Sequence, residues 1–293
     1  MKSPIRALSL AVGFAALPLS GCELLQGLYQ QDLEIPIPLE TPAAELDATA
    51  QVESAESSLC SDPDSRNCLV VKALDYSDDQ NVGDPPTIPD EFPVEVTVMD
   101  PATQMEETIN AEDWAKEAGL SEGMDLAQAI PVDLTEAVGV ETPDAVKAVT
   151  FKNVKLNWQE NSFTFDTVPF DLYVSSEAID DLSDAQALID AGTVQKVGTI
   201  PVQPAATTGE ADVTFEEGGE ERFSDALKAL TFTVVVALPP NTEVTLNDGT
   251  DLPDGTATKK KPLGFAKVSM KADLVYTVSA ADVVGQVQDA TQQ

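Results

Sequence analysis

A twelve-residue alternation of apolar and polar side chains near the C-terminal end constrains the fold most. The apolar positions are Val268, Met270, Ala272, Leu274, Tyr276 and Val278. Lys267, Ser269, Lys271 and Asp273 occupy the other parity. Because side chains of a strand alternate between its two faces, this pattern predicts a β-strand with one face in a hydrophobic core and one toward solvent.

Further segments have the same period of two and are separated by polar, turn-forming residues. They are Val94–Val98, Val149–Trp158, Phe163–Val174, Val194–Val202, Ala211–Phe215 and Leu230–Leu238. Regular strand–helix alternation is missing from the pattern, so we expect a mainly β protein, an antiparallel β-sandwich with short helical insertions. An α+β arrangement is the alternative.

Three of these segments carry finer signals. In Val149–Trp158 the apolar parity changes at Lys152–Asn153, which predicts a β-bulge. A second change near Asp166–Thr167 would lie opposite the first if the two segments formed a hairpin. Both faces of Leu230–Leu238 are apolar, which indicates a central strand.

Four short helices are predicted from capping residues and periodicity. They are Asn110–Gly119, Ser121–Ile130, Ser183–Gly192 and Glu220–Ala229. Trp114, on the first of these, is expected to dock that helix on the core, and Trp158 falls on the apolar side of its strand.

The stretch from Glu23 to Ser58 is polar, acidic and rich in alanine, which is typical of a tether. Leu33–Leu39 interrupts it, because apolar residues alternate there with polar residues or proline. Pro36 and Pro38 lack a backbone N–H, so this segment is predicted to be an edge strand. A Pro- and Asp-rich connection is expected over Asp75–Phe92.

The N-terminus has the organisation of an export signal. Lys2 and Arg6 precede an apolar run, Ala7–Leu19, that is too short to span a bilayer. The run ends in Leu19-Ser20-Gly21-Cys22, which resembles the lipobox of bacterial lipoproteins. The resemblance implies cleavage before Cys22 and acylation of that residue, and two or more acyl chains anchor a protein stably to a bilayer. An unlipidated export signal with a chance cysteine is the alternative.

The predicted organisation follows from this signal. Residues 1–21 are the signal peptide, 22–32 the acylated N-terminus and tether, 33–278 a single sandwich-like domain and 279–293 a C-terminal tail. Glu23 replaces the aspartate that favours inner-membrane retention in such lipoproteins, so the resemblance implies a cell-envelope protein at the outer membrane. Beyond the leader, the sequence contains no apolar stretch near 18 residues.

Three cysteines are present, and lipidation of Cys22 leaves Cys60 and Cys68 as a pair. The intervening residues are polar and turn-forming, so we expect a disulfide formed in an oxidising compartment. Closing a loop this small contributes about 2.5 kcal/mol in the chain-entropy model. A metal or redox site is the alternative, but other soft ligands are missing nearby in the sequence.

The chain has a net charge of −35, which becomes −37 when Lys2 and Arg6 leave with the signal. Such acidity disfavours nucleic acid and anionic lipid headgroups as partners. The chain contains no histidine, which excludes Ser-His-Asp and Cys-His catalysis and His-ligated metal sites within it. No cofactor is expected.

Two acidic segments are weak calcium candidates. The first contains Asp75, Asp78, Asp79 and Asp84, but Gln80 and Pro86 stand where an EF-hand loop needs glycine and glutamate. The second contains Asp248, Asp251 and Asp254, in a sequence that also favours ordinary turns.

A basic group contains Lys259, Lys260, Lys261, Lys267 and Lys271. It could meet phosphates, an acidic partner or the protein's own acidic surface. The preferred interpretation is a solvated hairpin tip whose charges prevent edge pairing.

The sequence therefore predicts a lipid-anchored envelope protein with a non-catalytic binding or structural role and an envelope protein or glycan as partner. A calcium- or glycan-binding adhesion module and a carboxylate-based hydrolase are the alternatives. The sequence does not indicate the oligomeric state.

Overall fold

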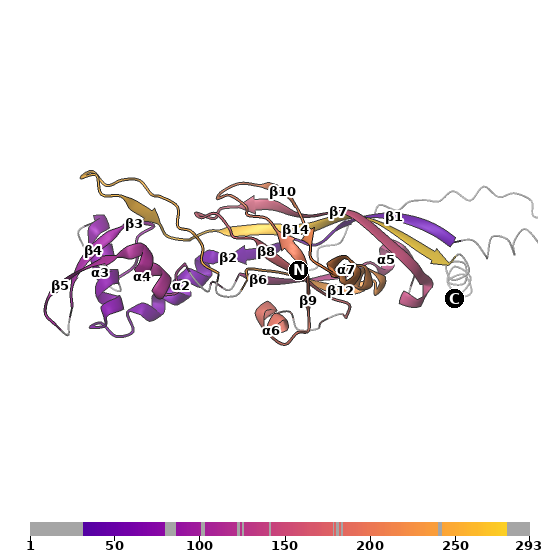
Figure 1. The fold of residues 1–293 in the computed structure, drawn as a ribbon, viewed down its shortest axis with the longest axis horizontal. Coiled ribbons are helices and arrows are strands. Elements are labelled where there is room, and N and C mark those ends of the chain that lie inside the picture. Colours follow the sequence, from indigo (N-terminus) through magenta and orange to yellow (C-terminus); the bar gives the residue numbers. More distant parts are fainter. Residues whose placement is uncertain are drawn as a thin grey trace, which may run out of the picture.

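A computed structural model describes residues 32–279, apart from 80–85, 101–102, 122–123, 125, 141, 178, 180–181, 183 and 240–241. For residues 76–79 it describes the backbone alone. The molecule is elongated, with a two-sheet body and a smaller lobe at one end (Figure 1). Strands dominate and pair antiparallel, so the predicted mainly β, sandwich-like fold is confirmed.

The first sheet, here the front sheet, is built around the alternating C-terminal segment. Its strand order is β1-β14-β7-β10, with β2 also paired to β14. The strands are β1 (Asp32–Glu40), β2 (Ala44–Asp47), β7 (Val146–Asn161), β10 (Gly209–Asp212) and β14 (Phe265–Ser279). All six apolar positions predicted for β14 are buried, which confirms the alternation.

The second sheet, here the back sheet, has the order β11-β9-β8-β12-β6. Its strands are β6 (Ala127–Asp133), β8 (Phe170–Ser175), β9 (Gln195–Ile200), β11 (Thr214–Phe215) and β12 (Thr231–Ala237). Phe232, Val234 and Val236 of β12 join the main core, whereas Val235 and Ala237 pack in a second cluster with residues of α6 (Ala185–Asp190). β12 has β8 and β6 as neighbours, so the prediction of a central strand is confirmed.

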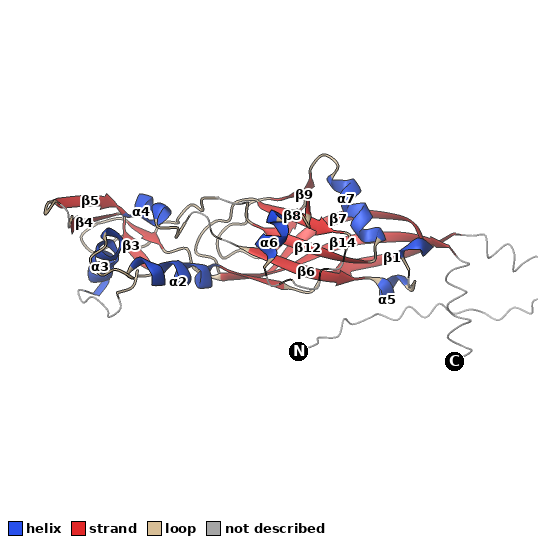
Figure 2. Ribbon diagram, turned by 90° about the horizontal axis from the view of Figure 1, so that it is seen from below, coloured by secondary structure: helices blue, strands red, loops and turns tan. Residues whose placement is uncertain are grey.

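The end lobe, defined here as residues 48–121 and 244–261, extends from one end of the sandwich (Figure 2). Its elements are α2 (Ala48–Leu59), α3 (Arg66–Asp79), β3 (Glu91–Pro93), β4 (Glu95–Met99), β5 (Glu106–Asn110), α4 (Ala111–Glu117) and β13 (Thr258–Lys260). Val52, Val70 and Trp114 of the lobe belong to the same hydrophobic cluster as the sandwich core. The lobe is therefore continuous with the body through packed side chains.

Three short helical elements complete the body: α5 (Thr135–Val138), a 3₁₀ turn η1 (Pro143–Ala145) and α7 (Gly219–Lys228). On α7, Phe223 packs edge-on to Phe151 of β7, with ring centroids 5.0 Å apart. The helix packs against both sheets, because it also contacts β9 and β12.

Several local predictions are confirmed. β1 is an edge strand of the front sheet and carries Pro36 and Pro38. The register of β7 against β14 shifts between Lys155 and Lys152, which is the predicted bulge, and Asn153 there has a φ of 54°. Asn110 caps α4 by accepting hydrogen bonds from the N–H groups of Glu112 and Asp113, both at 3.0 Å.

Other predictions are wrong, each for a tertiary reason. Residues 127–130 belong to strand β6 rather than a helix, because β12 pairs with them. Strands β7 and β8 lie in different sheets and form no hairpin, since β7 pairs with β14 and β8 with β12.

The predicted connection is shorter than expected, whereas the predicted tether, residues 22–32, lies outside the described residues except for Asp32, the first residue of β1. The tether interpretation of residues 23–58 fails over β2 and α2, where Asp47 caps the helix. The connection predicted over Asp75–Phe92 contains the last turns of α3 and the start of β3.

Candidate functional site

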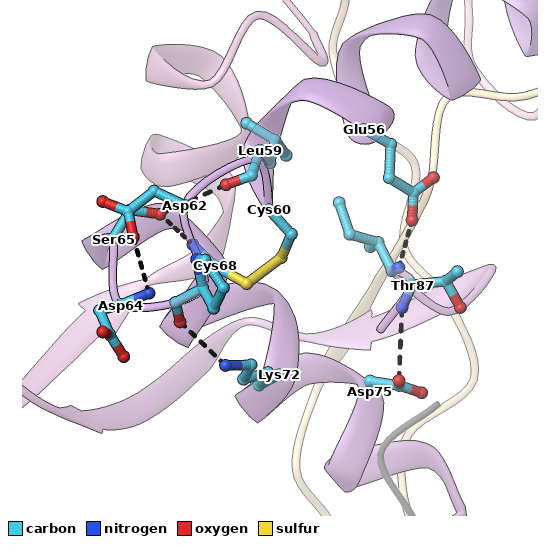
Figure 3. Close-up of a disulfide and its surroundings, with 12 residues drawn as sticks. Glu56, Leu59, Cys60, Asp62, Asp64, Ser65, Cys68, Lys72, Asp75 and Thr87 are labelled. Carbon is cyan, nitrogen blue, oxygen red and sulfur yellow. Dashed lines mark hydrogen bonds between the residues drawn. A yellow bond between two sulfur atoms is a disulfide. The ribbon is translucent and has the colours of Figure 1, made fainter. Parts of the chain in front are cut away.

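The disulfide joins the end of α2 to the first turn of α3 (Figure 3). The Cα atoms of Cys60 and Cys68 are 4.5 Å apart. Between them the chain is held by local bonds, in which the N–H of Asp64 donates to Asp62 Oδ1 at 3.1 Å and the N–H of Cys68 donates to Ser65 Oγ at 3.2 Å. The expected pairing is therefore present and fixes the corner between the two helices.

A buried ion pair crosses the end lobe beside this corner. Lys261 Nζ lies 3.1 Å from Glu56 Oε2, and the two side chains are only 9% and 11% exposed. Both also bind the backbone of Ile88, because Lys261 Nζ donates to its carbonyl oxygen at 2.7 Å and Glu56 Oε1 accepts from its N–H. The pair thus ties α2 to β13 and to the segment that precedes β3.

The first calcium candidate lies only partly within the described residues. Asp75, Asp78 and Asp79 lie in α3, and Asp84 lies outside the described residues. Asp75 Oδ2 accepts a hydrogen bond from the N–H of Thr87 at 3.3 Å (Figure 3). The acidic loop that a calcium site of this kind needs is therefore replaced by a helix over Asp75, Asp78 and Asp79.

The second calcium candidate is a turn in which Asp248 pairs with a lysine and Asp254 accepts a backbone hydrogen bond within the turn. Asp248 Oδ1 lies 3.1 Å from Lys259 Nζ, and Asp254 Oδ1 accepts from the N–H of Thr256 at 2.9 Å. That backbone bond lowers the pKa of Asp254. Asp251 is exposed. Among the residues that the structure describes, no three potential ligands converge on a metal position.

The interpretation of the basic group as a solvated hairpin tip is wrong. Lys259 contacts Asp248 and, at 3.4 Å, Glu112, and Lys261 is buried on Glu56. The protein's own acidic surface, one of the alternatives in the sequence, therefore takes these charges. Tertiary contacts decide this, since Glu56 is 205 residues from its lysine.

The face of the front sheet that is turned away from the core is called here the paired face. Its lysines and glutamates form ion pairs between neighbouring strands. Lys155 and Lys271 each lie 3.1 Å from an oxygen of Glu210, and Lys267 lies 3.0 Å from Glu160. Hydrogen bonds from the two lysines are the main cause of the lowered pKa of Glu210. Asn153 in the bulge donates to Asp273 Oδ2 at 2.6 Å.

The back sheet carries an ionisable cluster that the sequence did not reveal. Lys196 Nζ lies 2.6 Å from Oδ1 of the buried Asp171, and the hydroxyl of Tyr173 donates to Asp171 Oδ2 at 3.3 Å. The pKa of Tyr173 is raised to about 12, mainly because the phenol is partly buried and also because the negative charge of Asp171 lies beside it. The phenol thus stays protonated at neutral pH. The pairing of β8 with β9 brings these residues together, so no motif could have shown them.

A shallow groove of about 410 Å³ runs along α2 toward the residues that follow α4. Its lining is mostly small or polar: Gln51, Val52, Ser54, Ala55, Ser58, Gly119 and Met124.

The outer face of the two-stranded sheet β4–β5, here the open face, is a second region missed by sequence reasoning. It consists of Glu95, Thr97, Met99, Glu106, Thr108 and Asn110, all exposed. The opposite face is buried through Val96, Val98 and Ile109. The alternation in Val94–Val98 predicted this two-sided strand, but it could not show that the described residues of the lobe would leave its polar face exposed.

Cys22, the predicted site of lipidation, lies outside the described residues. Within the described part, no helix is both long and apolar enough to cross a membrane. Comparison of the chain with protein-family models, curated proteins and solved structures found no match.

Proposed function

We propose that this protein is a bacterial envelope lipoprotein, anchored by acylated Cys22 at the outer membrane, with a non-catalytic binding or structural role. The observation that carries the proposal is the Leu19–Cys22 motif after a basic and apolar leader. The disulfide between Cys60 and Cys68 supports it, because such bonds persist in oxidising compartments.

The shape of the molecule agrees with an anchor at this position. Strand β1 begins at Asp32, ten residues after Cys22, at the end of the sandwich opposite to the end lobe (Figures 1 and 2). Ten residues span at most about 35 Å. An anchored protein would hold the sandwich near the bilayer and present the end lobe away from it.

The local chemistry favours binding over catalysis. Glu210 and Asp254 are exposed, and hydrogen bonds from lysines and from a backbone N–H lower their pKa values, so neither of these two carboxyls suits the general acid of a hydrolase. The acids of the second calcium candidate are engaged by Lys259 and by the N–H of Thr256. These contacts favour a protein-binding or structural role over the adhesion module and the hydrolase.

The proposal is tested by expressing the full chain in a bacterium and analysing its N-terminus by mass spectrometry. We expect Cys22 as the first residue, carrying acyl groups, and the protein in the detergent phase after phase partitioning. The Cys22→Ser variant should move to the aqueous phase. A bare thiol on Cys22, or a leader still attached to wild-type protein, would overturn the proposal.

A further inference from the structure

The open face combines exposure with apolar character. Met99 in its corner is 49% exposed, and Met105, which lies next to Glu106 at the same turn of the hairpin, is 65% exposed. Among the described residues only Leu33 and Val202 are other large hydrophobic side chains of such exposure. Methionine is flexible and polarisable, and proteins use it at surfaces that bind other proteins.

The sheet behind this face is held firmly. Val96 and Val98 are each 6% exposed, and α3 packs against β4. Arg66 at the start of α3 forms a largely exposed ion pair with Glu107 of β5, with Nη2 2.9 Å from Oε1. A rigid surface loses little conformational entropy on binding, so it is suited to docking.

The charge of the lobe determines which partner fits. The end lobe contains 20 acidic and 6 basic residues. Five of the basic residues are already engaged by acceptors of the protein itself: Arg66, Lys72, Lys116, Lys259 and Lys261. On the open face, Glu95 and Glu106 have no ion-pair partner within the described residues, so their charges are available to a cation.

The spacing of the two carboxylates distinguishes between kinds of cation. Glu95 pairs with Asn110 at one end of the sheet and Glu106 with Met99 at the other. Four residues of strand separate these ends, about 13 Å. One metal ion cannot bridge that distance, whereas two basic side chains of a protein can. Thr97 and Thr108, whose hydroxyl oxygens are 3.5 Å apart, lie between them.

We propose that the open face is a docking surface for a basic protein segment. Two lysines or arginines of that segment pair with Glu95 and Glu106, and an apolar side chain beside the second one packs on Met99, the cross-strand neighbour of Glu106. Charge complementarity of this kind accelerates association and sets orientation. The inference rests on the proposed anchoring at Cys22, because an anchored protein presents the end lobe away from the bilayer.

Photocrosslinking in living cells tests the proposal with the full chain. A photoreactive amino acid replaces Thr108 on the open face or, as a matched control, Thr150, an exposed threonine of β7 in the front sheet. We expect a protein adduct from position 108 and none from 150, with a crosslinked peptide that is rich in lysine or arginine.

Charge variants sharpen this experiment. Glu95→Gln/Glu106→Gln should lower the adduct yield about tenfold, and Met99→Ser should lower it as well. The matched variant Glu34→Gln/Glu45→Gln, with two exposed acids of the front sheet, should leave the yield unchanged. Unchanged melting temperatures show that each variant is folded.

Several outcomes would overturn the docking proposal. They are the absence of an adduct at position 108, an acidic or neutral crosslinked peptide, a lipid or glycan adduct, or a yield that Glu95→Gln/Glu106→Gln does not change. Mass spectrometry of the Cys22 peptide from the same cells reports on anchoring independently. Failure of docking with Cys22 acylated is therefore distinct from failure of the anchor itself.

Discussion

Two solvent-facing sheet surfaces of this protein differ in whether their charged side chains form ion pairs. On the paired face of the front sheet, Lys155 and Lys271 share Glu210, and Lys267 meets Glu160. On the open face of β4–β5, Glu95 and Glu106 flank threonines and an exposed methionine without a cationic neighbour in the described structure. A face that satisfies its own charges gains little from a partner, whereas the open face keeps its interactions available.

The largest expected effect comes from breaking the buried ion pair Glu56–Lys261, which holds the end lobe behind the open face. Glu56→Leu leaves an ammonium buried without its carboxylate, so we expect a loss of about 3–5 kcal/mol in the free energy of unfolding. Denaturant unfolding measures it. The double variant Glu56→Leu/Lys261→Met should regain most of the loss, and a single variant as stable as wild type would mean that the pair does not hold the lobe.

Removal of the disulfide is expected to have the next largest effect. Cys60→Ser/Cys68→Ser frees the α2–α3 corner and should lower stability by about 2.5 kcal/mol. Hydrogen exchange should show faster exchange in α2 and α3, with little change in β12 and β14 of the sandwich. Equal acceleration in both regions would mean that the disulfide stabilises the whole molecule rather than the end lobe.

A matched charge reversal compares the two faces directly. Glu210→Lys places a third ammonium beside Lys155 and Lys271 and should lower the melting temperature, less so at high salt. Glu106→Lys replaces a carboxylate that has no ion-pair partner in the described structure, so stability should stay within about 0.5 kcal/mol of wild type. Similar losses for both reversals, measured by thermal unfolding, would erase the distinction between the faces.

The smallest effect concerns pH. The folded protein lowers the pKa of Glu210, so its carboxylate stabilises the fold above its unfolded pKa of about 4.3, and this contribution is lost as the pH falls through the folded value. Glu210→Gln should therefore be less stable than wild type at pH 7, and this difference should disappear once the pH is well below the folded pKa of Glu210. Melting curves across this range would reveal a constant gap if the lysine contacts were not the cause.

Much of the sandwich could be predicted from the sequence. The alternation in β14, the prolines of β1 and the parity change in β7 each specify a local geometry, because side-chain period and backbone hydrogen bonding are properties of a few neighbouring residues. The cap of α4 by Asn110 is equally local. By contrast, residues 127–130 looked helical, and pairing with β12 made them a strand.

Neither the buried pair nor the open face could be predicted. Lys261 reads as a charge at a solvated tip, but the fold places it on Glu56, and nothing in its neighbourhood along the chain indicates that partner. The open face is defined by what packs behind β4 and by what does not lie in front of it. The position of α3, which packs against β4, decides which face of the hairpin is buried.

The sequence by itself determined the exclusion of histidine chemistry and the strand-rich character of the chain, and it predicts an export signal ending at Cys22, because composition and short-range periodicity are properties of consecutive residues. The tertiary structure decided which strands are neighbours, which lysines are neutralised and which sheet face stays uncovered. Those outcomes arise from contacts between residues far apart in the chain, whose energies depend on distance in space and on burial rather than on position in the sequence.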